Sequence, residues 1–588
     1  MKRDKSENAL PLTRILAKWR QNPRRKGRAS LQVLLPQEVY CSRHCANMQT
    51  VMGKFWRTFS KTELLFISVT IFYGLLIMFN SKYFSPHDDF LFLQAFDENK
   101  WRGIQDSEFY SGRFNLLHGL DLFLATFINK YYNSIVYYLI SSFIFFINSL
   151  ILLKIIKLSL NIKIRGVHLL LYTLLLFSTS FTSIYFRILY PERYIILLIS
   201  FIYLLHLHFA KSTWHSSQKI AFILIVFFCN YVMQLKEPSI LCIIFIGIGN
   251  ILFYLSNKFR NRVDNFNLYI GISLIISGVI VIMIYFLIIY PKLHSRYGAN
   301  GIPFFINLLK SIVEWTIADP AIFVLFLPIF TYKMYHNFKN NAFDFHDIFS
   351  LGAIGYMLTF FITGMAYSQH YLTPLYVLII PFLFKNFNSN FRFKYLLILT
   401  IILQFGNISL GINDIVFQKY NNHNFSSVIE KMDSITKHNY TINKTRTTFH
   451  VLGGKDQGNH FSHGALYFMN KKGNDDKMFD FASFETIADS AYAINIIEKP
   501  PYTFMNTNIN KPVFSGDYIL YTPYTLLVPE SDGINKILIN SWNAPSYFGY
   551  LNFKDLIRLA VTKFYKNKIV IRDNKSYRVA KYELYRVK

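Results

Sequence analysis

Two adjacent carboxylates and a histidine stand directly after the first long apolar run of the sequence. Asp88 and Asp89 follow His87 in the segment SPHDDFLFLQAF. A carboxylate beside a substrate hydroxyl can act as a general base, and a second carboxylate can orient the first or hold a divalent cation. Asp is also a favoured helix N-cap, so one of the pair could instead begin a helix. The two residues are our candidates for catalysis, and both interpretations stay open.

Further ionisable residues stand at the ends of later apolar runs and in the loops that join them. They occur in the segments YSGRFNLLHGLD, FRILYPERY, MQLKEPS, PKLHSRYG and YSQHYLTP. Charge is costly at membrane depth, about 2.5 to 3.5 kcal/mol at a helix centre, so such groups indicate either anchoring at the membrane surface or function. The candidate substrate-binding residues are His87, Arg113, Arg187, Glu192, Arg193, Lys236, Glu237, His294, Arg296 and His370.

The basic members of this set are suited to binding a phosphate group. Charge-assisted hydrogen bonds contribute about 1.5 to 3 kcal/mol each. The candidates for this role are Arg187, Arg193, Lys236 and Arg296. Glu192 and Glu237 stand beside basic residues and are expected to hold those side chains in place. His294 and His370 could bind a substrate, or could be ordinary hydrogen-bonding residues.

The composition excludes most soluble classes of protein. The 588 residues are 52% hydrophobic and only 16% charged, whereas soluble domains average about 25% charged residues. The formal charge is +28, but neither a zinc-finger spacing nor an RNA-binding signature accompanies it, so we expect no nucleic-acid partner. Four cysteines cannot support a disulfide scaffold, and Cys41 with Cys45 lacks the second pair of a zinc site. The sequence leaves the metal requirement unknown and indicates no cofactor beyond a divalent cation at the Asp pair.

Apolar runs of membrane-spanning length recur through most of the chain. A spanning helix needs about 20 apolar residues. Eleven candidates lie at residues 63–80, 134–153, 167–186, 194–210, 219–235, 239–255, 268–290, 320–334, 347–366, 371–385 and 395–412. Two further stretches, 116–128 and 302–317, hold polar interruptions and are expected in the membrane interface. The sequence therefore predicts a polytopic α-helical membrane protein with about eleven transmembrane helices.

The distribution of Lys and Arg predicts the orientation of these spans. Short cytoplasmic loops are enriched in Lys and Arg. With the basic arm of residues 1–62 in the cytoplasm, every even-numbered loop between the eleven spans is basic. The N-terminus is then cytoplasmic, and the loop of residues 81–133, with the Asp pair, is external. The arm itself could be a segment attracted to anionic lipids or the product of an over-extended reading frame.

Residues 413–588 are more polar than the preceding spans and predict a small extracytoplasmic domain of mixed α/β structure. The segments VFSGDYILYTPYTLLV and KIVIRDNKSYRVAKYELYRV are typical of strands, and SHGALYFMNKKG is typical of a helix. The segments NNHNFSS and KKGNDDK are predicted to be loops. Residues 63–412 form the transmembrane part that precedes this domain.

The order of the short motifs resembles the GT-C superfamily of glycosyltransferases, which use polyprenyl-phosphate-linked sugars. The resemblance rests on HDDF after the first span, GRF later in the same loop, and PER and KEP before later spans, and it covers roughly residues 62–410. It implies a GT-C-like transmembrane fold, a lipid-linked sugar donor, and often a soluble extracytoplasmic domain after the spans. It also implies that Asp88 or Asp89 is the catalytic base.

These observations predict an integral membrane glycosyltransferase of the inner (cytoplasmic) membrane. Its expected partners are a lipid-linked sugar donor, a cell-envelope glycan or lipid acceptor on the extracytoplasmic face, and membrane lipids. A sugar phosphate leaves as a stable anion, so one base suffices where a glycoside hydrolase needs two carboxylates. A transporter or flippase of lipid-linked glycans, and a polysaccharide polymerase or ligase, are the alternatives. A flippase should carry charged or Gly/Pro-broken segments at mid-membrane, whereas the predicted spans keep their charges at their outer ends.

Overall fold

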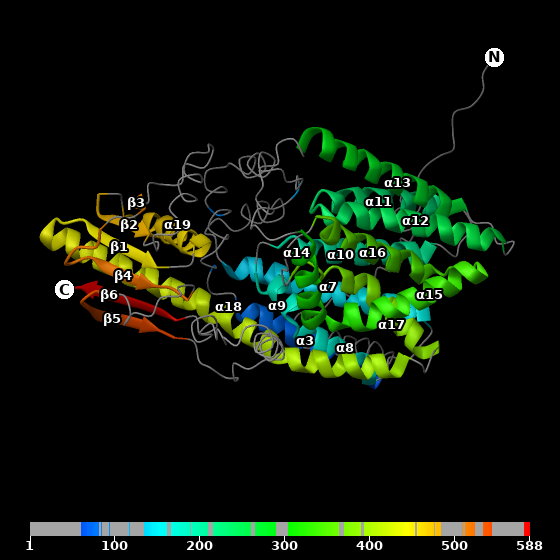
Figure 1. Ribbon diagram of the computed structural model, residues 1–588, viewed down its shortest axis with the longest axis horizontal. Coiled ribbons are helices and arrows are strands. Elements are labelled where there is room, and N and C mark those ends of the chain that lie inside the picture. The colour runs from blue at the N-terminus through cyan, green and yellow to red at the C-terminus, as the bar shows by residue number, and fades with distance from the viewer. Residues whose placement is uncertain are drawn as a thin grey trace, which may run out of the picture. The chain divides into compact units, whose positions relative to one another are not determined.

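Helices account for most of the described chain, as the long apolar runs predict (Figure 1). The computed structural model describes residues 60–80, 84, 93, 117, 134–160, 166–187, 190–209, 216–259, 265–289, 304–363, 370–389, 393–452, 455–474, 477–483, 508–509, 512–523, 533–543 and 581–588. Nearly all of the arm predicted at residues 1–62 lies outside these residues.

The described helices fall into two groups along the chain. The first group comprises α3 (Lys61–Phe79), α7 (Ser134–Leu160), α8 (Gly166–Leu176), α9 (Thr179–Tyr185), α10 (Glu192–Phe209), α11 (Ser216–Met233), α12 (Pro238–Phe259) and α13 (Asn265–Ile284), which continues as a π-helix, η1 (Tyr285–Ile289). The second group comprises α14 (Phe304–Ala318), a π-helix η3 (Ala321–Phe326), α15 (Leu327–Asn340), α16 (Phe345–Thr363), α17 (Leu375–Ser389) and α18 (Lys394–Asn443).

Many of these helices are long and apolar enough to cross a membrane. Within the described residues there are 7 such helices, or up to 9 if each of two bent helix pairs counts as one span. The predicted spans at 219–235 and 371–385 coincide with shorter apolar helices, Gln218–Met233 and Leu375–Asn386. A multi-pass membrane protein is therefore indicated, while the count of eleven spans stays a prediction.

Two predicted spans are not straight helices. The run at 167–186 is α8 and α9, which meet at an angle of 60°, and the run at 320–334 begins at a bend of 94° after Ser311–Ala318. Hydropathy records which residues avoid water but carries no information on helix direction, so the bends could not be predicted from it. The stretch expected in the interface, 302–317, contains Trp315, which is fully buried.

Glycines allow α12, α13 and α16 to approach closely. Figure 1 shows α11, α12 and α13 side by side, and α12 packs against both α13 and α16. A Cβ atom on Gly247 of α12 would lie 2.9 Å from the carbonyl oxygen of Gly271 on α13, and one on Gly271 would lie 2.8 Å from the oxygen of Gly247. Small residues at such a crossing let two helix backbones pack together, as is common inside membranes.

Ion pairs join the ends of the helices where the basic loops were predicted. Lys157, near the end of α7, lies 3.1 Å from Glu63 at the start of α3. Asp344, before α16, pairs with Lys333 of α15 and with Lys385 of α17, the latter at 3.0 Å. Although burial alone would raise the pKa of Asp344, Lys333 and Lys385 lower that pKa below its usual value. These contacts fix the packing at this end of the helices.

One unbroken helix, α18, connects the apolar helices to the C-terminal sheet. Its first half contacts α8, α9 and η3, and its second half contacts α19, β1 and β6. The boundary predicted at residue 413 falls inside this helix, and the loop predicted for NNHNFSS is wrong because residues 421–427 are helical. Asn421 and Asn422 are buried against Tyr582 and Tyr138, and this packing outweighs their weak helix propensity.

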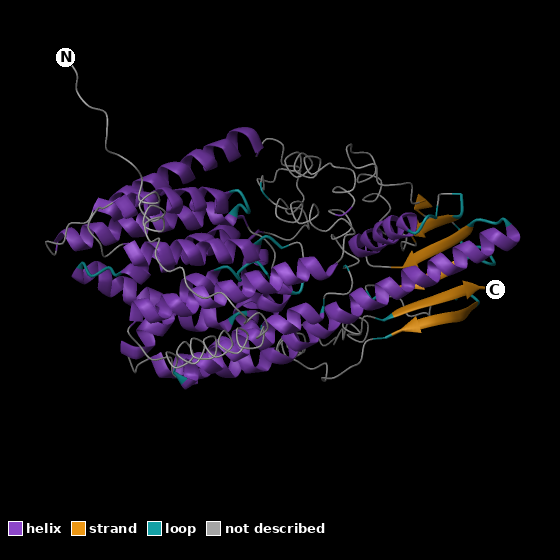
Figure 2. Ribbon diagram, turned by 180° about the vertical axis from the view of Figure 1, so that it is seen from behind, coloured by secondary structure: helices purple, strands orange, loops and turns teal. Residues whose placement is uncertain are grey.

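Six strands form one sheet in the described part of the C-terminal region, drawn in orange in Figure 2. They are β1 (Thr447–Leu452), β2 (Phe479–Ser483), β3 (Asn508–Ile509), β4 (Tyr518–Tyr521), β5 (Lys536–Trp542) and β6 (Tyr582–Val587). The sheet order is β3-β2-β1-β4-β6-β5, with the first four strands parallel and β6 antiparallel to both β4 and β5. Helix α19 (Lys455–Lys471) connects β1 to β2.

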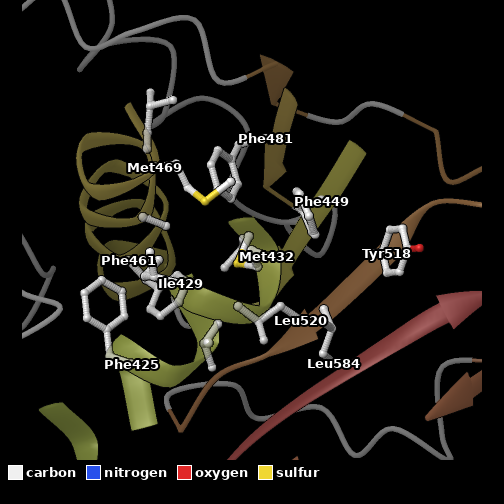
Figure 3. Packing of buried hydrophobic residues seen from close by; sticks show 14 of the residues in the cluster. Phe425, Ile429, Met432, Phe449, Phe461, Met469, Phe481, Tyr518, Leu520 and Leu584 are labelled. Atoms are coloured by element: carbon white, nitrogen blue, oxygen red, sulfur yellow. The ribbon is translucent and has the colours of Figure 1, made fainter. Parts of the chain in front are cut away.

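The core of this region lies between the sheet and the helices α18 and α19 (Figure 3). Phe425 and Met432 of α18 pack with Phe461 of α19 and with Phe449 and Leu520 of the sheet. The strand predicted around Tyr518 and the helix predicted from SHGALYFMNKKG are confirmed in the described residues. The final predicted strand is confirmed for its last part, β6, and the remainder lies outside the described residues.

Candidate functional site

The motifs PER and KEP form the beginnings of two helices. Pro191 immediately precedes α10, and its carbonyl oxygen accepts the backbone N–H groups of Tyr194 at 2.9 Å and Ile195 at 3.1 Å. Pro238 is the first residue of α12. Proline suits the first turn of a helix because that turn needs no N–H donor from it. The charged residues beside each proline are thereby held at the same end of two helices.

Glu192 links the PER and KEP motifs to His370, which lies between α16 and α17. Its side chain is fully buried and forms an ion pair with Lys236 through Oε1. The same oxygen lies 3.7 Å from Nε2 of His370. Its second oxygen, Oε2, has no hydrogen-bond partner among the described residues. The structure therefore brings three of the predicted residues together, and Glu192 holds Lys236 although its neighbour in the sequence is Arg193.

His370 lies in an aromatic and basic environment. Its ring stacks on Tyr190 with the centroids 4.1 Å apart, and Lys236 lies over the ring of the adjacent Tyr371 at 4.6 Å. Burial lowers the pKa of His370 to about 3, and Lys236 and Arg187 act in the same direction while Glu192 opposes them. The imidazole is thus neutral at physiological pH and can both donate and accept a hydrogen bond.

Arg187 is joined to His370 through Tyr190. Its Nη1 donates to the Tyr190 hydroxyl at 2.7 Å. With the Gln418 amide oriented to suit, the side-chain oxygen of Gln418 accepts from Nη2 at 2.8 Å and from Nε at 3.0 Å. These two contacts hold the guanidinium in place. A fixed, partly exposed guanidinium is suited to binding phosphate or carboxylate oxygens.

Arg193 is a positioning residue for Arg187. Its guanidinium is almost completely buried and lies over the ring of Tyr194 at 4.9 Å. Its Nη1 donates to the backbone oxygen of Arg187 at 3.3 Å. The charge of Arg193 therefore adds to the local positive potential, while the side chain itself fixes the backbone that carries Arg187. We call Arg187, Glu192, Arg193, Lys236 and His370 the Arg187 cluster.

Glu237 is half-buried beside Lys236, at the same helix end as the Arg187 cluster. The remaining predicted residues lie outside the described part of the chain. They are the catalytic candidates Asp88 and Asp89, and the binding candidates His87, Arg113, His294 and Arg296.

Described residues of the predicted external loop, 81–133, contact this end of the helices. The backbone N–H of Leu117 donates to the carbonyl oxygen of Gln234 at 3.3 Å, two residues before Lys236. Phe84, four residues before Asp88, packs against Tyr137 of α7 and against Phe468 of α19. The loop thus has one contact beside the Arg187 cluster and another at the C-terminal region.

The sequence did not identify the contribution of α18. Besides Gln418, Asp414 lies one helical turn away on the same helix, and its Oδ2 accepts from the Thr182 hydroxyl of α9 at 2.9 Å. Thr182 and Asp414 are 232 residues apart in the chain. Asp414 stands two residues after the predicted span 395–412 and four residues before Gln418. A spacing of four places both polar side chains on one face of a helix, and this could have identified Asp414 from the sequence.

A buried acid also lies where the two bent helix pairs meet. Asp319, at the 94° bend, accepts from Tyr376 at 2.6 Å and from Ser180 at 2.6 and 2.8 Å. Asp319 immediately precedes the predicted span 320–334 and was not among the candidate site residues. Side chains of α18 bond to carbonyl oxygens near both breaks, Gln404 to Leu174 at 3.4 Å and Asn407 to Ile317 at 2.5 Å. Such bonds satisfy backbone groups freed by a bend inside a membrane.

Comparison with known proteins adds no assignment to this arrangement. Within the described residues, no group of three or more His, Cys, Asp or Glu side chains could hold a metal ion. Neither a protein-family model nor a curated protein matches this chain.

Proposed function

We propose that this protein is an integral membrane glycosyltransferase that transfers a sugar from a polyprenyl-phosphate carrier to a cell-envelope glycan or lipid. The observation that carries the proposal is the Arg187 cluster. It gathers two arginines, a lysine and a neutral histidine from segments far apart in the sequence at one end of apolar helices. The likeness of its PER and KEP motifs to the GT-C superfamily supports the same function.

The cluster provides the chemistry that a phosphate leaving group needs. As the bond between the sugar and the phosphate breaks, negative charge grows on the phosphate oxygens, and fixed cations stabilise it. Arg187 is held by Tyr190 and Gln418, and Lys236 is held by Glu192, so neither side chain needs to reorganise during the reaction. A base must take the proton from the acceptor hydroxyl, and we assign that role to Asp88 or Asp89.

Lipid-extract mass spectrometry tests this function in cells. Cells that lack the protein should accumulate one sugar-phosphate lipid and lose one modified glycan or lipid. Wild-type protein should restore both the lipid and the glycan to normal levels. At least one of the variants Asp88→Asn and Asp89→Asn, each checked for expression and folding, should fail to restore them. Full restoration by both variants would contradict the assignment of the base.

A flippase of lipid-linked glycans is the second candidate, and one observation favours it. Asp319 is buried at the junction of the two bent helix pairs, and acids beside broken helices are typical of transport pathways. The same mass spectrometry distinguishes the two functions. A flippase moves a lipid-linked glycan without forming a new glycosidic bond, so its loss would leave every lipid-linked species chemically complete and confined to one leaflet.

A further inference from the structure

Exposed apolar side chains follow one face of α18 where this helix begins. Tyr395, Ile398, Ile402 and Phe405 are separated by intervals of three and four residues, so they share one side of the helix. Their exposed fractions lie between 42% and 76%. Because these residues belong to an apolar run of membrane-spanning length, the environment that suits this face is the hydrocarbon of a bilayer. Tyr395 then marks the boundary of the hydrocarbon, where tyrosine is enriched in membrane proteins.

Helix α15 brings further exposed aromatic side chains to the beginning of α18. Tyr332 and Tyr335, in the second half of α15, are both exposed. The ring of Tyr332 packs against that of Phe393, the residue before α18, with the centroids 5.6 Å apart. The end of α15 and the beginning of α18 thus form one surface. We call this surface the α15–α18 corner, and it consists of Tyr332, Tyr335, Lys339, Phe393, Lys394 and Tyr395.

Two exposed lysines make the α15–α18 corner basic. Lys339 stands four residues after Tyr335, on the same face of α15, and Lys394 is the first residue of α18. Lys339 forms no ion pair with a residue that the structure describes. Lysine and tyrosine side chains at the end of an apolar face are typical of the headgroup level of a bilayer.

The described carboxylates around the beginning of α16 already have lysine partners. Asp344 pairs with Lys333 and, at 3.0 Å, with Lys385. Asp347 lies 2.7 Å from Lys333. Two lysines therefore balance these two carboxylates, which leaves the positive charge of Lys339 without compensation from them. The corner is suited to a partner with negative charge.

This combination selects a phospholipid with an anionic headgroup. Ammonium and phenol groups can both donate hydrogen bonds to phosphate oxygens, and the apolar face of α18 continues beside them. A soluble anion would use the charges of the corner but not the apolar face. A neutral phospholipid would use the apolar face but would gain less from the lysines.

We propose that the α15–α18 corner binds the headgroup of an anionic phospholipid, whose acyl chains lie along the exposed apolar face of α18. This inference is independent of the proposed glycosyltransferase function, because no residue of the Arg187 cluster takes part. A lipid that contacts both α15 and α18 binds the folded protein only, so it should stabilise the fold.

Native mass spectrometry tests the proposal on the full-length protein in detergent, titrated with phosphatidylglycerol or with phosphatidylcholine. The wild type should bind phosphatidylglycerol more tightly. The double variant Lys339→Gln/Lys394→Gln should lose about tenfold or more in affinity for phosphatidylglycerol, because two positive charges beside the headgroup are removed. Its affinity for phosphatidylcholine should not change. Phosphatidylglycerol should also raise the midpoint of thermal unfolding of the wild type more than that of this variant.

The double variant Lys61→Gln/Lys154→Gln is the matched control. Both lysines are exposed, one at the beginning of α3 and one near the end of α7, and the ion pair between Lys157 and Glu63 joins these two helix ends. The control removes the same total charge outside the corner and should leave the affinity for phosphatidylglycerol unchanged. Equal losses in the two double variants would show a general attraction of a basic protein for anionic lipid and would overturn the proposed site.

A third variant separates the aromatic contribution from the charges. Tyr335→Leu keeps an apolar side chain at an exposed position but removes the hydroxyl, and it should weaken phosphatidylglycerol binding although both lysines remain. Equal affinity of the wild type for the two lipids would contradict the proposal. Displacement of bound phosphatidylglycerol by inorganic phosphate would also contradict it, because the site would then recognise a soluble anion.

Discussion

Glu192 and His370 show how the protein keeps positive charge beside buried apolar surface. Glu192 pairs with Lys236, while His370 lies close to the same carboxylate yet remains neutral because burial outweighs the attraction. Arg187 and Arg193 lie close by, with hydrogen bonds to the Tyr190 hydroxyl and to the backbone oxygen of Arg187. Fixed cations of this kind are suited to binding a phosphate group.

His370 should make the protein less stable in mild acid. Its folded pKa is lowered to about 3 from a usual value of 6.5, so the unfolded chain binds a proton over an interval in which the folded chain does not. The stabilisation is complete above pH 6.5 and is lost as the pH falls from 6.5 towards 3. Thermal unfolding in detergent at a series of pH values measures this, and we expect a loss on the order of 2 kcal/mol by pH 4.5.

The variant His370→Gln is the control for this pH dependence. Gln keeps hydrogen-bonding capacity but does not titrate, so the difference in unfolding free energy between wild type and variant should shrink as the pH falls. A difference that stays constant from pH 7 to pH 4.5 would show that His370 does not titrate as its burial requires.

All five members of the Arg187 cluster were predicted from the sequence, whereas Gln418 and Asp414 of α18 were not. Glu192, Lys236 and His370 stand next to apolar runs in motifs that the sequence displays, and the structure brings them together. Gln418 and Asp414 lie in the part of α18 that follows its apolar run, and their spacing of four residues is the signal that the sequence offers for them. Their partners, Arg187 and Thr182, are more than two hundred residues away, so only tertiary packing reveals these contacts.

At the scale of elements, α18 is the helix that joins the apolar helices to the C-terminal sheet and contacts Arg187 through Gln418. It passes the break between α8 and α9 so closely that a Cβ atom on Gly411 would overlap the carbonyl oxygen of Phe177. The apolar run predicted at 395–412 lies in α18, but a mixed α/β domain was predicted to begin at residue 413, with a loop at NNHNFSS. The helix continues, and further along it Asn422 is buried against Tyr138 and Phe425 is buried in the core of the C-terminal region.

Gly411→Ala should therefore destabilise the protein, although alanine is the better helix former. The usual gain is about 0.5 to 1 kcal/mol in a helix interior, but here the methyl group has no room beside Phe177. We expect a lower midpoint of thermal unfolding and displacement of α18 from α9. The matched change Gly166→Ala places a methyl group where nothing lies within 4 Å and should be neutral or slightly stabilising. Equal effects of the two substitutions would contradict the packing described for α18.

At the scale of the whole molecule, the Arg187 cluster and the ion pairs of Asp344 lie at opposite helix ends. Helix α10 begins at Glu192 in the cluster, whereas α16 begins beside Asp344 and runs towards His370. Lys333 and Lys385, two described members of the basic loops predicted to be cytoplasmic, lie at the Asp344 end. If the positive-inside rule holds, the Arg187 cluster and the C-terminal region both face the extracytoplasmic side.

Cysteine labelling in right-side-out membrane vesicles measures this orientation. Single cysteines in a cysteine-free background replace Lys437, which is exposed on the second half of α18, or Lys339, which is exposed at the end of α15. A membrane-impermeant maleimide should label Lys437→Cys and should label Lys339→Cys only after detergent is added. The opposite pattern would place the Arg187 cluster in the cytoplasm and remove the basis for an external acceptor.

The central claim is that Arg187 binds the phosphate of a lipid-linked donor. Fluorescence titration of the purified protein in nanodiscs with polyprenyl monophosphate tests it most directly. The wild type should bind, and Arg187→Met should lose about tenfold or more in affinity, because charge-assisted hydrogen bonds are removed while side-chain length is kept. Equal affinity in a folded Arg187→Met variant, or no binding by the wild type, would contradict the account.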